Sequence, residues 1–212
     1  MDNLPAAQVD IWNLALDLIG ENEPVESPTE ERLAAEVCRR HYGRTLKQAL
    51  SAYPWAWASK QSALSTPAGV TRTGWDYVYA LPADCVRPVA LLADGERISL
   101  LDLESRHPFA IMLDDTGHGH LLCCDLDASA DDFEVLEYTA LAEYIPIYPG
   151  AFVDALAYAL ASPLAAAVKK DRKMAVEHRQ MARLVLAQAW AEEQNSLTPD
   201  VEQTTPSIAA RG

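Results

Sequence analysis

Apolar residues near the amino end recur at the spacing of one helix face. Five of them fall at positions i, i+3, i+4, i+7 and i+8: Ile11, Leu14, Ala15, Leu18 and Ile19. Trp12 and Leu16 widen this face, and Gly20 follows at a natural helix stop. The pattern predicts an amphipathic first helix, with Trp12 as a structural anchor in its apolar face.

A second helix is predicted from a start signal at Ser27. Ser27 is a good N-cap residue, Pro28 suits the first helical position, and Glu30 lies three residues after the cap, where it can satisfy a free backbone donor. We expect this helix to run to about Tyr53, because Pro54 stops it. Seven of its residues are expected to face inward: Ala34, Val37, Cys38, Tyr42, Leu46, Ala49 and Leu50.

The stretch YPWAWASK, residues 53–60, places Trp55 and Trp57 two positions apart, directly after Pro54. In an extended chain, residues two apart face the same side, so both indoles would turn onto the helices. Burying them contributes several kcal/mol, at about 25 cal/mol per Å² of apolar area. We therefore interpret Trp55 and Trp57 as structural anchors rather than as a binding surface.

The pattern changes to that of short strands between about residues 70 and 139. Aromatic residues alternate early in this segment: Trp75, Tyr77 and Tyr79. Later, short apolar runs at 110–113 and 121–124 flank turn residues. The segment reads as a small antiparallel β insertion.

Helical spacing returns after Pro149 and Gly150. An apolar helix is expected over 152–168, with Phe152 as an anchor and a kink at Pro163. A following helix shows a packing seam in steps of four and three: Met174, His178, Met181, Val185 and Gln188. The polar tail, 198–212, is expected to be disordered alone and to order on a partner.

Together these patterns predict an α+β protein, a mainly α-helical bundle core with an inserted small antiparallel β domain. We expect N-terminal core helices in 1–69, the β insertion in 70–140, C-terminal core helices in 141–196 and a flexible C-terminal arm in 197–212. The chain has 212 residues, of which 50% are hydrophobic, so it can bury a substantial core.

The chain is strongly acidic, with 17 Lys and Arg against 31 Asp and Glu, a formal charge of −14. Such a surface repels duplex DNA and anionic membranes, which argues against sequence-specific DNA binding. The amino end lacks the pattern of a signal peptide, so we expect reduced cysteines in a cytoplasm. The apolar window 151–168 contains Asp154 and Pro163, which favours a buried helix over a membrane span.

The segment 114–124 contains residue types that bind transition metals. His118, His120, Cys123 and Cys124 make a small metal-dependent enzyme the alternative function. Their spacing lacks a paired CxxC or HxxxH arrangement, however, and Asp-Thr-Gly-His-Gly also suits the turn of a hairpin between two apolar strands.

Other catalytic patterns are weaker. Cys38 and His41 are neighbours on a helix, which suits a core thiol beside an interface histidine better than a nucleophile and its base. The sequence has no GxxxxGK[ST], GxGxxG, GxSxG or HExxH motif. We therefore expect no enzymatic activity, no cofactor and no bound metal.

One basic cluster stands out in the acidic chain. Its members are Lys169, Lys170, Arg172 and Lys173, with Arg179 and Arg183 further along. One interpretation is a solvated helix junction. The other is an assembly contact with an acidic neighbour, which can be another copy of the chain, because two different patches on identical subunits can close a ring.

The order of several motifs resembles the head-to-tail connector proteins of tailed phages. The first motifs are Ile11-Trp12-Asn13-Leu14-Ala15-Leu16 with Ile19-Gly20, the helix start at 27–30, Tyr42, and Tyr53-Pro54-Trp55 with Trp57-Ala58 and Lys60. Similar segments follow at 79–87 and 152–157. The pattern is most similar to the tail tubular protein A, or adaptor, group of short-tailed phages, and it spans roughly residues 7–195.

This resemblance implies a non-enzymatic virion protein, made in the host cytoplasm and located at the portal vertex and tail. It implies a dodecameric ring that binds the portal protein above and a downstream tail protein, such as a nozzle or tail tube, below. DNA would pass through the lumen during ejection without sequence recognition, and no membrane is involved. An acidic lumen suits that role because it offers phosphate no adhesive contacts. A connector at another layer of the same tail is the related alternative.

Overall fold

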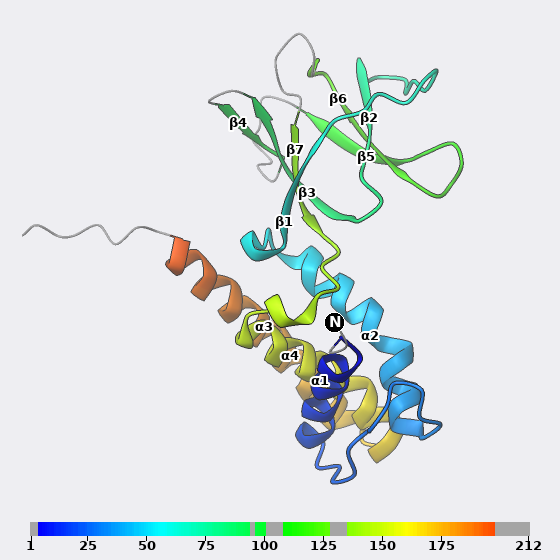
Figure 1. Ribbon diagram of the computed structural model, residues 1–212, viewed down its shortest axis with the longest axis vertical. Coiled ribbons are helices and arrows are strands. Elements are labelled where there is room, and N and C mark those ends of the chain that lie inside the picture. Colours follow the sequence, from blue (N-terminus) through cyan, green and yellow to red (C-terminus); the bar gives the residue numbers. More distant parts are fainter. Residues whose placement is uncertain (1–3, 94–95, 101–107, 128–134, 198–212) are drawn as a thin grey trace, which may run out of the picture.

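The computed structural model describes residues 4–93, 96–100, 108–127 and 135–197. Helices occupy one end of the molecule and strands the other (Figure 1). Within the described residues, four α-helices and two small antiparallel sheets make up the fold. The predicted α+β class, a helical core with an antiparallel β part inserted in the chain, is confirmed.

The helical body consists of α1 (Leu4–Leu18), α2 (Leu33–Ala52), α3 (Gly150–Leu164) and α4 (Arg172–Leu197). The central helix is α3, which packs against the other three. Its residues Phe152, Leu156, Leu160 and Leu164 recur every four positions and are fully buried. Each of these side chains stabilises the body by about 1.5–3 kcal/mol.

The buried face of α1 differs from the predicted one. Trp12, Ala15 and Leu16 are buried as expected, but Leu14 is 41% exposed. Apolar residues occupy so much of the circumference of α1 that their spacing alone does not predict which of them are buried. Packing against α3 makes that choice, and it leaves Leu14 on the outer side of the helix.

The predicted start of α2 at Ser27 is wrong, because the helix begins at Leu33. The capping groups are used within a separate turn: the backbone N–H of Glu30 bonds to the Ser27 carbonyl, and the Glu30 side chain accepts from the N–H of Glu26. Arg39 on α2 fastens this turn by donating to the Pro28 carbonyl. The predicted end and inward face are correct, since α2 stops at Ala52 and all seven expected residues are buried.

The first sheet has the strand order β1-β7-β3-β4. Its strands are β1 (Ser59–Ala63), β7 (Val135–Ala140), β3 (Cys85–Ala93) and β4 (Glu96–Ser99). The strand β1 begins well before residue 70, and it pairs antiparallel with β7. The chain therefore enters and leaves the β part through two neighbouring strands.

The second sheet has the order β2-β6-β5, with β2 (Tyr77–Ala80), β6 (His120–Cys124) and β5 (Phe109–Leu113). The predicted strands at 110–113 and 121–124 are confirmed, and they pair as an antiparallel hairpin. Side chains from both sheets share one core, in which Leu91, Leu122 and Leu136 are the best buried. The sheets therefore pack face to face over this core.

The helix that contains Pro163 changes character rather than stopping there. The α3 conformation runs to Leu164 and continues as a π-helix, η3 (Ala165–Lys169), which ends at Lys170 with a left-handed φ of 56°. The wider π turn follows directly after the residue that cannot donate a backbone hydrogen bond. The segment 150–169 is long and apolar enough to cross a membrane, but half of its apolar window is buried inside this fold.

The seam predicted on α4 is rotated from the buried one. Met181 is 42% exposed and Gln188 is also exposed. The buried positions are instead Ala175, Ala182 and Ala189, which recur every seven residues. Alanine carries little hydrophobic signal, but its small side chain allows α4 to lie close against α3.

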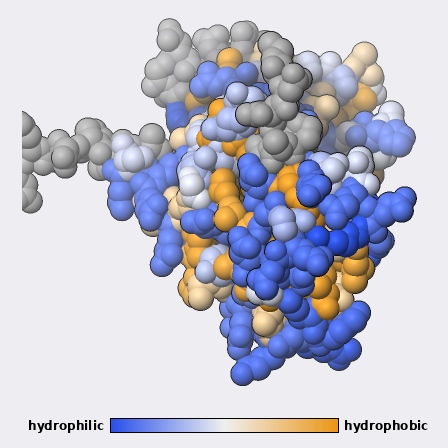
Figure 2. Space-filling view, turned by 60° about the horizontal axis from the view of Figure 1, so that its bottom comes forward, coloured by the Kyte–Doolittle hydropathy of each residue, from blue (hydrophilic) through white to orange (hydrophobic). Residues whose placement is uncertain are grey.

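The surface of the helical end is mostly hydrophilic, with apolar patches between the polar areas (Figure 2). Among the described residues of the four α-helices, five large apolar side chains are substantially exposed: Leu14, Leu33, Val176, Met181 and Leu184. Four of these lie on α1 and α4, so these two helices offer apolar contacts to a partner.

Candidate functional site

An aromatic cluster joins the helical body to the β part. Trp55 is 1% exposed, its indole nitrogen donates to the Ala49 carbonyl at 3.0 Å, and its ring lies 5.2 Å from that of Phe152. Trp57 is half-buried and its ring lies 4.8 Å from the same Phe152 ring. The residues that follow Trp55 form a short 3₁₀-helix, η1 (Ala56–Ala58), which contains Trp57, instead of the expected extended segment. Both indoles nevertheless pack on the helices.

Two charged side chains reinforce this junction. Glu193 near the end of α4 accepts hydrogen bonds from the backbone N–H groups of Ala56 and Trp57, at 2.8 and 3.2 Å. Arg87 of β3 donates to the last carbonyls of α2, those of Ser51 and Ala52. Unpaired N–H groups at the start of a helix carry partial positive charge, and unpaired carbonyls at its end carry partial negative charge. The negative Glu193 and the positive Arg87 therefore each stabilise the junction. Burial raises the pKa of the Glu193 carboxyl.

The remaining predicted anchor, Trp12, is fully buried between α1 and α2. Its ring meets that of Tyr42 edge-on at a centroid distance of 6.4 Å. Asn13 of α1 also holds the loop that follows the helix. Its side-chain amide donates to the Val25 carbonyl and accepts from the Val25 backbone N–H. These contacts hold α1 in place and fix its outer face.

The histidine and cysteine side chains of the segment 114–124 do not converge on one point in the structure. Cys123 and Cys124 are buried on opposite faces of β6, in two different clusters, whereas His118 and His120 are exposed. The turn before β6 is the predicted hairpin turn, with Gly117 at a φ of 75°. Across the described ranges, no group of three or more His, Cys, Asp or Glu residues converges on a point.

The turn itself is organised by Asp114. Its carboxylate accepts from the Thr116 hydroxyl and from the His118 backbone N–H, and these hydrogen bonds lower its pKa. Neither contact involves a histidine ring. The segment is accounted for as a structural turn.

The neighbours Cys38 and His41 also separate in the fold. Burial raises the pKa of the Cys38 thiol to about 12, so it is not a thiolate near neutral pH. His41 lies on the side of α2 that faces α3 and α4, and burial together with Arg40 and Arg44 lowers its pKa. The pair does not form a nucleophile and its base.

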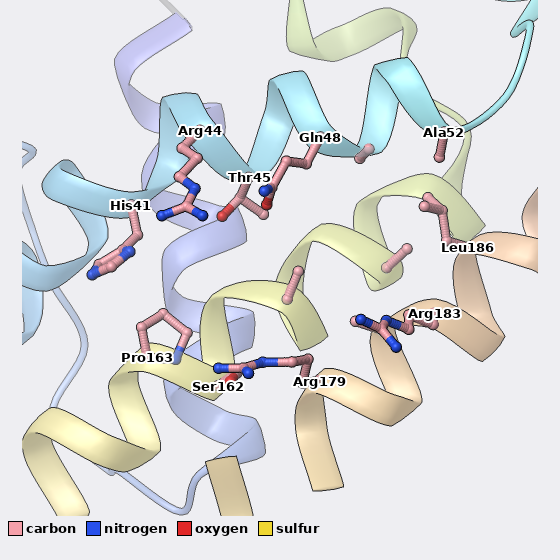
Figure 3. Close-up of a pocket in the computed structure, with 14 residues that line it drawn as sticks. His41, Arg44, Thr45, Gln48, Ala52, Ser162, Pro163, Arg179, Arg183 and Leu186 are labelled. Carbon is pink, nitrogen blue, oxygen red and sulfur yellow. The ribbon is translucent and has the colours of Figure 1, made fainter. Parts of the chain in front are cut away.

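A groove of about 650 Å³ lies between α2, α3 and α4 (Figure 3). We call it the arginine groove. Its floor is α3, with Ala155, Ala159, Ser162 and Pro163. One wall is α2, with His41, Arg44, Thr45, Gln48, Ala49 and Ala52, and the other is α4, with Arg179, Ala182, Arg183 and Leu186.

The lining of the arginine groove contains basic, neutral polar and apolar residues but no acidic residue. Arg44 projects from one wall and Arg179 and Arg183 from the other, and no carboxylate lines the groove. Among the residues that the structure places, no ion pair joins these three guanidinium groups to a carboxylate. The net charge of the chain is −14, so three arginines with no carboxylate partner among the described residues make this groove a local positive patch on an acidic protein.

The structure divides the predicted basic cluster. Only Arg179 and Arg183 reach the groove. Lys169 instead pairs with Glu21 at 3.0 Å, and Lys173 lies 3.7 Å from Glu177 one turn along α4. Two further members are exposed: Lys170, which follows η3, and Arg172, the first residue of α4.

Of the groove residues on α2, Arg44 was not predicted as part of any site, and His41 was predicted only as an interface histidine beside Cys38. They share a face of α2 with Gln48, at offsets of three and four residues, and this face lies beside the buried one. The sequence alone could therefore place these residues on one face of α2. That this face meets Arg179 and Arg183 across α3 is a property of the tertiary fold alone.

No protein-family model matches the chain, and no curated protein sequence matches it. The resemblance to phage connectors therefore rests on the order of motifs in the sequence.

Proposed function

We propose that the protein is a structural, non-enzymatic head-to-tail adaptor that assembles as a ring below the portal of a tailed phage. The observation that carries this proposal is the arginine groove. An acidic chain that keeps three unpaired arginines around an open groove presents a surface complementary to most of its own surface. Such a surface suits assembly with further copies of the chain.

The junction between the two parts supports the same role. A connector must hold its parts in a defined relation so that one ring layer transmits the symmetry of the layer above. Here Trp55, Trp57 and Phe152 pack together, and Glu193 and Arg87 cap the adjoining helix ends. The β part is fastened to the helices by buried contacts rather than by a free linker.

The proposed ring is a dodecamer that binds the portal protein on one side and a downstream tail protein, a nozzle or tail tube, on the other. DNA passes through its lumen without sequence recognition. Acidic residues facing the lumen would repel phosphate and so keep the channel free of adhesive contacts. The expected contribution of the arm, residues 197–212, lies almost wholly outside the described residues.

Negative-stain microscopy tests this function. The purified protein is mixed with the assembled portal encoded in the same genome, and each component alone serves as the control. The proposal expects a new ring layer on one end of the portal with a continuous central channel. Bare portals at micromolar concentrations of both proteins would overturn it, and a ring that binds a different tail component would assign the protein to another layer.

A further inference from the structure

The outer face of α1 carries a short acidic and apolar stripe. Asp10, Leu14 and Asp17 lie at offsets of four and three residues, so they share one face of the helix. All three are exposed, Leu14 to 41%. Neither aspartate forms an ion pair with the residues that the structure describes. We call this set the α1 stripe.

The arginine groove has the opposite pattern. Its floor offers a small apolar surface at the half-buried Ala159, while the walls present Arg44 on one side and Arg179 and Arg183 on the other. An apolar side chain flanked by two carboxylates matches this surface, because the apolar group can lie on this alanine while the carboxylates meet the guanidinium groups.

We propose that the arginine groove binds the α1 stripe of a second copy of this chain. This inference rests on the proposed assembly into a ring, and it names the contact between neighbouring subunits. Leu14 then covers the alanine floor, and Asp10 and Asp17, about two helical turns apart, pair with arginines on the walls.

The placement of the two surfaces makes the contact directional. α1 packs on α3 and lies behind it in the view into the groove (Figure 3). The stripe and the groove therefore occupy different sides of one subunit, and a contact between them is heterologous. Repetition of a heterologous contact closes a ring when the rotation per subunit permits and otherwise extends a filament.

A charge exchange tests the contact. Variant A carries Arg179→Glu and Arg183→Glu, and variant B carries Asp10→Arg and Asp17→Arg. Each variant alone juxtaposes like charges at every contact, so assembly is expected to fall by about tenfold or more. In an equal mixture, each groove meets a stripe of opposite charge, and we expect assembly to return with alternating subunits. The matched control, Arg172→Glu with Lys173→Glu, makes the same charge change on α4 outside the groove and is expected to assemble normally.

A disulfide assay reads the contact without the portal. Copies with Leu14→Cys are mixed with copies with Ala159→Cys under mild oxidation, and the covalent dimer is mapped by mass spectrometry. We expect this dimer to form between these two positions, and to be lost when the reversals of variant A are added to the Ala159→Cys copy. Circular dichroism of every variant confirms that it is folded.

The outcomes separate this inference from the proposed function. Absence of the mapped disulfide, or failure of the A and B mixture to recover while each variant stays folded, would overturn the contact. Loss of assembly in variant A with normal assembly in variant B would also overturn it and assign the groove to another acidic segment, such as residues 198–212. A disulfide between copies that nonetheless form no ring on a portal would retain the contact and overturn the adaptor function.

Discussion

The carboxylate of Glu193, near the end of α4, accepts a hydrogen bond from the backbone N–H of Ala56 at 2.8 Å. The two residues are 137 positions apart in the chain, and the contact caps the 3₁₀-helix that leads into β1. Only one carboxylate oxygen is used in this way, because the second, Oε2, is buried without a hydrogen-bond partner among the described residues. The contact thus combines a useful cap with a costly buried charge.

Glu193→Gln is expected to remove that cost while keeping the acceptor oxygen. Burial raises the folded-state pKa of Glu193 above its ordinary value of 4.5, so the native state holds the proton more tightly than the unfolded state. The stability that this group contributes is present below pH 4.5 and is lost as pH rises through the folded pKa. We expect the wild type to lose stability across this window and the Gln variant not to, as measured by thermal unfolding at a series of pH values.

Glu193→Ala serves as the matched control, because it removes both the charge and the acceptor. It leaves the N–H groups of Ala56 and Trp57 without their partner, which costs about 1–3 kcal/mol. Equal stability of the Gln and Ala variants at every pH would show that the hydrogen bonds from Ala56 and Trp57 to residue 193 do not contribute to the free energy of unfolding.

Trp55→Ala is expected to destabilise the protein by about 3–5 kcal/mol. The side chain is 1% exposed, packs against Phe152 and donates to the Ala49 carbonyl, so its removal leaves a cavity and an unpaired acceptor. Trp55→Phe keeps an aromatic ring and is expected to cost less. Chemical denaturation of the three proteins gives the comparison, and wild-type stability in the Ala variant would show that the junction does not depend on this residue.

Asp84→Asn is expected to weaken the β part at neutral pH but not in acid. The Lys60 ammonium lies 2.6 Å from Asp84, and this hydrogen bond lowers the pKa of the carboxyl below 3.8. The corresponding stability is present above pH 3.8 and is lost as pH falls through the folded pKa. Because the Lys60 side chain is 58% exposed, we expect an effect of about 0.5 kcal/mol, reduced further by salt. Urea denaturation at two pH values measures it, and an equal effect at both would contradict the ion pair.

The four cysteines are expected to react slowly in the native protein. Burial raises the pKa of Cys38 and Cys85 to about 12 and also raises the pKa of Cys123 and Cys124. Little thiolate is therefore available at pH 8. A chromogenic disulfide reagent measures the rate, with unfolded protein as the reference for four thiols. Leu14→Cys adds an exposed thiol and is expected to react rapidly, whereas fast reaction of all four thiols in the unmodified native chain would contradict the burial of Cys38, Cys123 and Cys124.

The sequence was most informative where one hydrophobic face is unambiguous. The seven inward residues of α2, the two strands of the 109–124 hairpin and the overall α+β arrangement follow from spacing and turn residues alone. The capping residues at 27–30 misled because a local turn satisfies the same donors that a helix start would. The seam on α4 misled because its buried residues are alanines, which apolar spacing does not distinguish from their neighbours.

The arginine groove shows a different limit. Arg179 and Arg183 stood out by charge, but Arg44 and His41 lie more than 130 residues earlier and join them only through the packing of three helices. Periodicity assigns each residue to a face of its own helix. It gives no information on which faces of different helices lie opposite each other.

The pairing of β1 with β7 has a mechanical consequence. Ser59 and Thr139 lie opposite each other, and Thr139 pairs on its other side with Arg87, so the strand that returns the chain to the helical body lies between β1 and β3. A force on the distal sheets is therefore carried by β1 and β7 in parallel, because both strands run between the helical body and the rest of the β part. A partner pulling on the β part would meet a stiff tether, and strain would pass directly to the helix ends that Glu193 and Arg87 hold.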